Sequence, residues 1–234
     1  MTQPMPKPLR KPAPSVRGSL SRERIAEAAL AMIDRYGVDG LALRKLAQAL
    51  GCEAMSLYHH VQDKDDLLDA VMDRLLSEWE LAPLDSAEPR RLMRQAADSY
   101  RAIAQRHPRA FALLTSRRFN TPYALQVLEH MLGILARAGL PAAECARGFR
   151  IIGGFLNGLL LAEAAVQGVG RAASGPVLVD RAPQDFPMTR AAAPWLGPQG
   201  IEASYQTGIE WLLDAVIGPP PVPAGKKRTV AARR

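Results

Sequence analysis

A short stretch of the chain concentrates side chains that can bind DNA. Arg44 and Lys64 supply cations, and hydroxyl, imidazole, methyl and thioether groups lie between them. The planar fork of an arginine can bond guanine O6 and N7, whereas ammonium and hydroxyl groups bind phosphates. Methyl and thioether groups suit the methyl group of thymine. We therefore predict a DNA-reading surface made of Arg44, Ala54, Met55, Ser56, Tyr58, His59, His60 and Lys64.

The histidines and cysteines do not predict a metal site. Neighbouring residues of a helix point about 100° apart, so His59 and His60 cannot easily share one ion. Cys52 and Cys145 lack the spacing of a metal site or of a disulfide framework. The sequence also lacks a recognisable nucleophile, phosphate-loop or dinucleotide motif. We expect no metal, no cofactor and no enzymatic activity.

Two short helices are needed to present these side chains. The first has an apolar face with helical spacing, formed by Leu43, Leu46, Ala47 and Leu50, and Gly51 is typical of a helix end. A second helix, at 53–61, would bury Leu57 and Val61 and turn its other side chains outward. This pattern predicts a helix-turn-helix whose second helix suits a major groove. From the spacing alone, an ordinary helical bundle is an equal alternative.

The flanking sequence predicts two further helices. Ser21 can cap a helix that carries an apolar stripe and ends at Gly37. Asp63 can cap a helix that extends to Trp79, long enough to leave a small head and enter a second domain. We expect a three-helix head that a fourth helix joins to a helical body.

With these elements in place, the chain resembles the TetR family of bacterial transcriptional regulators. The resemblance spans residues 20 to 82, and its strongest parts are Arg44-Lys45-Leu46-Ala47-Gln48-Ala49-Leu50-Gly51 and Ser56-Leu57-Tyr58-His59-His60-Val61. It continues through Lys64 and Asp66-Leu67-Leu68-Asp69-Ala70. More loosely, Arg117, the helix at 125–138 and the run at 153–162 look like the ligand domain of tetracycline repressors.

The resemblance implies an all-α fold and a regulatory function. It implies a helix-turn-helix DNA-binding domain at 19–64, a helical ligand-binding and dimerisation domain at 65–218, and disordered basic tails at 1–18 and 219–234. It further implies a cytoplasmic homodimer that represses from an inverted-repeat operator on double-stranded DNA and is released by a small-molecule effector. Two alternatives stay open: a non-enzymatic helical protein-interaction module, and a DNA-binding protein controlled by a protein partner.

The positive charge of the chain is concentrated at its two ends. The formal net charge is +7, but residues 1–20 and 219–234 hold nine of the 30 Lys and Arg and no Asp or Glu, which leaves 21 basic against 23 acidic residues elsewhere. Such proline- and glycine-rich segments predict disorder. The C-terminal tail is best interpreted as a solubilising extension. The N-terminal arm is equally well interpreted as a contact to phosphates or a minor groove.

We expect no membrane partner. Residues 1–19 lack the apolar core of a signal peptide. The most apolar run, at 151–165, is interrupted by Asn157 and Glu163 and is shorter than the roughly 18 residues that a membrane span needs.

The body is expected to contain helices at 89–106, 108–118, 122–138, 141–168 and 199–216. Four of them begin with proline, which is favoured at the first helical position. Glycines at 148, 153, 154 and 158 weaken the fourth helix, so they predict a close approach of another helix or of a ligand. The resemblance implies that this helix and the last one form the dimer interface. Residues 169–198 are expected to be irregular, as a lid or a disordered connection.

The body helices also predict a ligand pocket. The candidate residues are His107, Phe111, Leu114, Arg117, Met131, Phe155 and Asn157, with Phe119, Leu135 and Phe149 as further apolar candidates and His107, Arg117 or Arg118 at the mouth. Each apolar member fits a core position equally well. The resemblance puts Leu113, Gly154 and Ala165 where tetracycline repressors carry the polar groups that hold a magnesium chelate. His59 replaces a tryptophan of those repressors. We therefore expect neither their ligand nor their operator.

Overall fold

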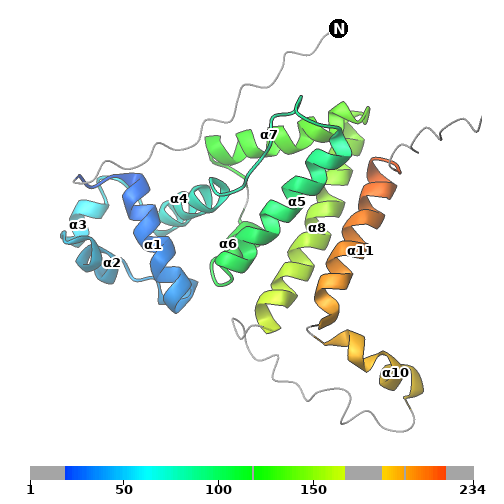
Figure 1. Ribbon diagram of the computed structural model, residues 1–234. Coiled ribbons are helices and arrows are strands. Elements are labelled where there is room, and N and C mark those ends of the chain that lie inside the picture. Colours follow the sequence, from blue (N-terminus) through cyan, green and yellow to red (C-terminus); the bar gives the residue numbers. More distant parts are fainter. Residues whose placement is uncertain (1–18, 118, 167–185, 198, 220–234) are drawn as a thin grey trace, which may run out of the picture.

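The computed structural model describes residues 19–117, 119–166, 186–197 and 199–219. Within these ranges the regular elements are all helices, which confirms the all-α expectation. A head formed by α1 (Arg22–Tyr36), η1 (Val38–Gly40), α2 (Leu43–Leu50) and α3 (Ala54–Leu57) lies at one side of the molecule. Helix α4 (Lys64–Leu76) leads from it to the body (Figure 1). The expected tail at 1–18, and residues 220–234 of the other, lie outside the described residues.

The helix ends of the head follow from local side-chain chemistry. The Ser21 hydroxyl accepts a hydrogen bond from the Arg24 amide at the start of α1, and the Asp63 carboxylate accepts one from the Asp66 amide at the start of α4. Gly37 and Gly51 end α1 and α2 with positive φ angles of 77° and 70°. The predicted caps and glycine stops are therefore confirmed.

The recognition helix is shorter than the sequence predicts. Helix α3 ends at Leu57, and the chain continues to His60 as turns instead of as helix. The His60 carbonyl accepts a hydrogen bond from the Arg22 side chain, a long-range contact that sequence periodicity does not register. The predicted buried positions hold: Leu57 and Val61 are 0% and 1% exposed, so α3 is anchored in the head core.

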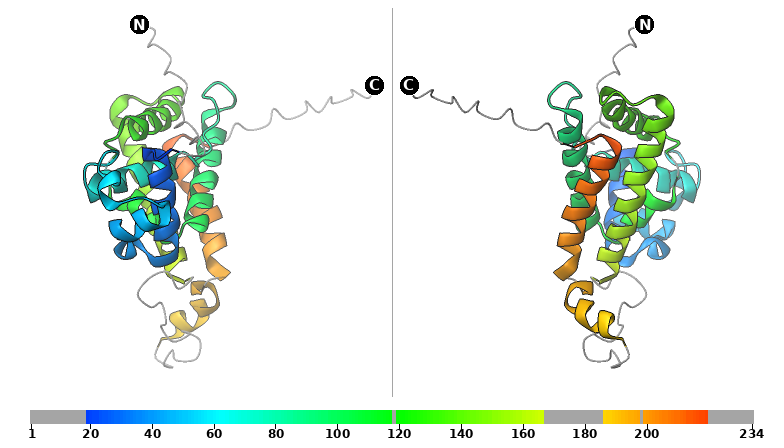
Figure 2. Two further views of the ribbon diagram at one scale, coloured as in Figure 1. Left: turned by 90° about the vertical axis from the view of Figure 1, so that its left-hand side faces the viewer. Right: turned by 90° about the vertical axis from the view of Figure 1, so that its right-hand side faces the viewer.

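The body consists of α5 (Pro89–Arg106), α6 (Phe111–Ser116), α7 (Pro122–Arg137), α8 (Ala142–Val166), α10 (Pro187–Leu196) and α11 (Gln199–Val216). Helices α5, α8 and α11 lie side by side, and α7 packs against α5 and α8 near one end (Figures 1 and 2). The bounds of α5 and α11 match the prediction. Helix α6 begins three residues late, because the His107 carbonyl accepts the amides of Ala110 and Phe111 in a tight turn.

Two expectations for the body are wrong. The stretch at 169–198 is not irregular throughout, because α10 begins with the favourable Pro187 and buries Ala193 as it packs against α11. Helix α8 is also long and apolar enough to span a membrane, with a mean hydropathy of 1.2 in Ala142–Ala165, since it begins well before Ile151. Core helices of soluble proteins have the same length and composition, and α8 packs against α5, α7 and α11.

Candidate DNA-reading surface and ligand cavity

The predicted DNA-reading residues are accessible on the α2–α3 side of the head. Met55 and Tyr58 are 69% and 46% exposed although both side chains are large and apolar in part. Arg44, His59 and Lys64 are also exposed, whereas Ala54, Ser56 and His60 are half-buried. Because Leu57 is fully buried, α3 is held with Met55 facing outward. The arrangement can present base-contacting and phosphate-contacting groups from one short helix and its flanks.

Lys64 occupies the first position of α4, next to its cap. The free backbone amides of a helix start favour anions, and an adjacent ammonium adds a full positive charge. Two carboxylates in the same turn, Asp65 and Asp66, oppose this preference. Arg22 pairs with Asp66 at 2.5 Å and so cancels the charge of that carboxylate.

A cavity of about 290 Å³ lies within the body, between the end of α4 and helices α5 to α8. This volume is at the small end of the usual range for ligand sites. The lining is almost entirely apolar and aromatic, with Asn157, Arg150 and the Tyr100 hydroxyl as its polar groups. It comprises Trp79, Met93, Ala97, Tyr100, Leu114, Phe119, Met131, Phe149, Arg150, Ile152, Gly153, Gly154, Leu156 and Asn157.

The aromatic rings of the cavity are fixed by their own contacts. The Trp79 and Tyr100 ring centroids are 4.6 Å apart, and the Trp79 indole donates a hydrogen bond to the Ala96 carbonyl at 2.8 Å. Phe119 and Phe149 meet edge to face with centroids 6.2 Å apart. The cavity lining is therefore rich in aromatic rings held by their own contacts, which suits an aromatic ligand.

Tyr100 and Asn157 form the polar centre of the cavity. The Tyr100 hydroxyl donates to the Asn157 side-chain carbonyl at 3.0 Å. Burial raises the pKa of Tyr100 well above its ordinary value, so the phenol stays neutral and keeps its donor. The Tyr100–Asn157 bond leaves the Asn157 amide hydrogens to donate to an acceptor on a ligand.

The structure brings together only part of the predicted pocket. Of the predicted residues, the cavity is lined by Leu114, Phe119, Met131, Phe149 and Asn157. Phe111 does not line it: it is fully buried behind Tyr100, with ring centroids 5.3 Å apart. Phe155 packs against Gly208 of α11, where a Cβ would lie 2.3 Å from its ring. Neither Phe111 nor Phe155 lines this cavity, contrary to the prediction, because apolar periodicity does not distinguish core positions from cavity positions.

His107 and Arg117 are not at the cavity mouth, because carboxylates of α1 and of the α4 region hold them elsewhere. His107 lies 2.7 Å from Asp34 of α1 and 3.1 Å from Glu78 beyond α4, and hydrogen bonding to Asp34 raises its pKa. Arg117 donates to Asp69 at 2.7 Å and to Asp65 at 3.2 Å. Arg118 lies outside the described residues. Both placements depend on long-range pairs that a single sequence does not reveal.

The segment after α6 connects the cavity to α4. Phe119 lines the cavity, while two residues before it Arg117 binds Asp65 and Asp69 of α4. Two residues after it, the Thr121 hydroxyl donates to Asp73 of α4 and accepts the Ala124 amide at the start of α7. A displacement of Phe119 would therefore act on α4 both through Arg117, which precedes it in the chain, and through Thr121, which follows it.

Sequence reasoning missed several cavity residues. The sequence marks Trp79 only as the end of the fourth predicted helix, and it singles out neither Tyr100 nor Arg150. Within the sequence, the glycines of α8 indicate where the cavity lies. Gly153 and Gly154 line it, and a Cβ at either would meet open space. Gly148 serves the other predicted purpose, since its Cβ would lie 2.6 Å from Val216 of α11. In the described ranges no group of three His, Cys, Asp or Glu could hold a metal ion.

Comparisons with known proteins agree in both halves of the chain. Residues 25–71 match the sequence model described as bacterial regulatory proteins, tetR family, and residues 83–216 match the tetracyclin repressor-like C-terminal domain. An HTH-type transcriptional regulator of Saccharopolyspora erythraea is 31% identical over 199 residues, covering 83% of each protein. The class A tetracycline repressor from transposon 1721 of Escherichia coli is 29% identical, covering 84% of this chain and 90% of the repressor.

Solved structures give the same result. ActR of Streptomyces coelicolor, described as a TetR family protein in complex with (S)-DNPA, superimposes with a TM-score of 0.68 and 27% identity. The match covers 86% of this chain and 98% of that one.

Proposed function

The chain belongs to the TetR family of bacterial regulatory proteins and is a helix-turn-helix transcriptional regulator, not an enzyme. We propose the following mechanism of regulation. The protein is a cytoplasmic homodimeric repressor that binds an inverted-repeat operator through α2 and α3. A small aromatic effector enters the body cavity and releases the DNA. The observation that carries this proposal is the joint presence of an exposed reading surface and of an aromatic cavity tied to α4.

Base reading is assigned to the start of α2 and to α3. Arg44 supplies a guanidinium for a guanine, and Met55, which is 69% exposed, supplies an apolar contact for a thymine methyl. Ala54 and Ser56 add a further methyl and a hydroxyl. Tyr58, His59, His60 and Lys64 contact phosphates and so fix the head on the duplex.

Dimerisation is assigned to α8 and α11. Their outer sides carry large apolar residues, with Ile151, Leu161 and Trp211 exposed by 50%, 38% and 71%. A second copy that covers this surface would remove it from water. Two heads would then read successive major grooves about 34–36 Å apart, which gives the inverted repeat.

The effector is a flat aromatic molecule that binds without a metal ion. Ring faces of Trp79, Tyr100 and Phe119 line the cavity, and Asn157 offers a donor for a carbonyl or similar acceptor. Arg150 can pair with an acidic group at the rim. The solved complex of the ActR relative with (S)-DNPA is consistent with a small organic effector.

Effector binding would reach the DNA through the segment from Arg117 to Thr121. A ligand that displaces Phe119 moves the side chains that hold α4, and α4 carries the head. The effector changes DNA affinity only if it binds better to the conformation in which the heads no longer fit successive grooves.

Selection of bound fragments from the source genome tests the DNA-binding part. The Arg44→Ala variant is run beside the wild type at near-physiological salt, and its thermal unfolding is checked to match. Recovery of a shared inverted repeat by the wild type, and its loss in the variant, is expected. Fragments without a common motif, retained equally by both proteins, would contradict the assignment and indicate charge-driven binding.

A further inference from the structure

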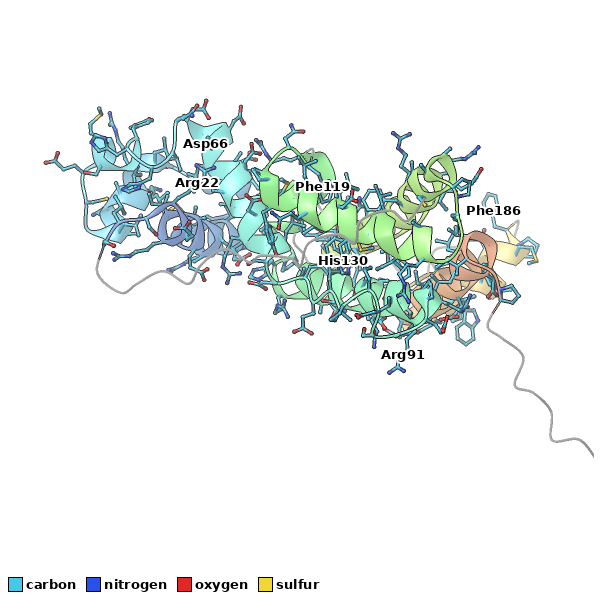
Figure 3. All side chains as sticks on the ribbon, turned by 90° about the horizontal axis from the view of Figure 1, so that it is seen from above. Arg22, Asp66, Arg91, Phe119, His130 and Phe186 are labelled. Carbon is cyan, nitrogen blue, oxygen red and sulfur yellow. The ribbon has the colours of Figure 1, made fainter. Side chains whose placement is uncertain are left out.

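Arg22 and Asp66 form a two-point ion pair between α1 and α4 (Figure 3). The Arg22 guanidinium donates to both carboxylate oxygens of Asp66, at 2.5 and 2.8 Å. Such a fork-to-fork arrangement fixes orientation as well as distance. The two side chains are 36% and 26% exposed, so the pair is partly shielded from water.

The same two side chains hold the connection between the recognition helix and α4. Arg22 donates to the carbonyl of His60 at 3.2 Å and to that of Asp66 at 3.1 Å. Asp66 accepts the backbone amide of Gln62 at 2.8 Å. The pair therefore bonds the backbone at residues 60, 62 and 66, which lie before, within and after the link at 61–63 that joins the turn after α3 to α4.

The link at 61–63 separates the phosphate-contacting groups proposed above. Tyr58 and His60 precede it, and Lys64 follows it at the start of α4. Because α3 contains only four residues, its own hydrogen bonds cannot set where these groups point. The Arg22–Asp66 pair supplies that restraint and also neutralises a carboxylate two residues from Lys64.

We propose that Arg22 and Asp66 are positioning residues for DNA binding: they set the spacing between the α3 side chains and Lys64 without contacting DNA. This inference rests on the proposed DNA-binding function. It predicts an effect on specific binding that exceeds any effect on stability. The number of phosphates engaged should also fall, because misplaced groups no longer reach the backbone of the duplex.

The test uses a charge-neutral double variant, Arg22→Gln with Asp66→Asn, in the full chain. The matched control is Glu27→Gln with Arg74→Gln, which is also charge-neutral and breaks a second ion pair between α1 and α4, together with the Arg74–Glu78 pair. The control leaves residues 60–66 untouched. The probes are a duplex with the inverted repeat that the wild type selects from random-sequence DNA and a scrambled duplex of equal length.

The double variant should bind the repeat about ten-fold more weakly, and its binding to scrambled DNA should weaken as well, because phosphate contacts carry no sequence information. Its log–log salt slope should fall by about one to two, since each lost phosphate contact removes roughly 0.9. The control should keep the wild-type affinity and slope, whatever its melting temperature. Equal losses in both variants, or an unchanged slope, would overturn the positioning role. Failure of the wild type to select any repeat would overturn the proposed function as well.

Discussion

Replacing His107 by glutamine should lower the stability of the protein in a pH-dependent way. His107 bridges Asp34 of α1 and Glu78, and its side chain is only 16% exposed. Arg74 and Arg106 also reach Glu78, and Arg109 donates to the Asp34 carbonyl. The cluster joins the head to the body, so the charge of His107 contributes to how firmly α1 is held.

The direction follows from the pKa of His107, which is raised in the folded protein above its ordinary value of 6.5, first by hydrogen bonding to Asp34. The contribution of the charged imidazole is therefore fully present below pH 6.5 and is lost as the pH rises through the raised value. Charge-assisted hydrogen bonds contribute about 1.5–3 kcal/mol before the cost of desolvating the pair. We expect a net difference of about 1–2 kcal/mol at pH 6, falling below about 0.5 kcal/mol at pH 9.

Urea unfolding of the wild type and of His107→Gln, at equal protomer concentration from pH 6 to 9, measures this difference. Titration of the other three histidines is common to both proteins and cancels. A difference that stays constant from pH 6 to 9 would contradict this prediction, because it would mean that no change in the charge of His107 alters the stability in this range.

Three further outcomes follow from the structure. Arg117→Gln should leave effector binding within about three-fold but reduce the coupling between effector and DNA by about 1 kcal/mol, measured as the ratio of DNA affinities with and without effector. Gly153→Ala should raise the free energy of unfolding by about 0.5–1 kcal/mol in a denaturant titration, because a Cβ there meets open space in the middle of a helix. Gly208→Leu should instead lower the melting temperature, because its side chain would displace the Phe155 ring from α11.

Local chemistry made the head predictable from its sequence. The helix caps and stops form hydrogen bonds only with residues within four positions, so the sequence predicts each of them correctly; they are Ser21, Gly37, Gly51 and Asp63. Helix α3 ends four residues before the predicted 61, and the turn that follows it is held by a bond from Arg22, 38 residues away, to the His60 carbonyl. Interactions over such separations leave no mark on periodicity.

The ligand site was only half predictable for the same reason. Leu114 and Phe111 lie on one short helix and have the same apolar character, yet the first lines the cavity and the second packs behind Tyr100. The sequence favours Arg117 as a ligand contact, because its actual partners, Asp65 and Asp69, lie about fifty residues earlier in the chain and are not recognisable as partners from the sequence. Only the packing of α4 against α6 distinguishes these roles.

A comparison of the wild type with a variant whose cavity is filled tests whether occupation of the body cavity controls DNA binding. Aromatic compounds are screened for thermal stabilisation of the wild type and for loss of that effect in Gly153→Leu, whose side chain fills the cavity. DNA affinity for the selected repeat is then measured with and without the retained compound. We expect the compound to weaken DNA binding by the wild type at least about ten-fold and to leave DNA binding by Gly153→Leu unchanged. A compound that occupies the cavity and leaves the DNA affinity of the wild type unchanged would contradict it.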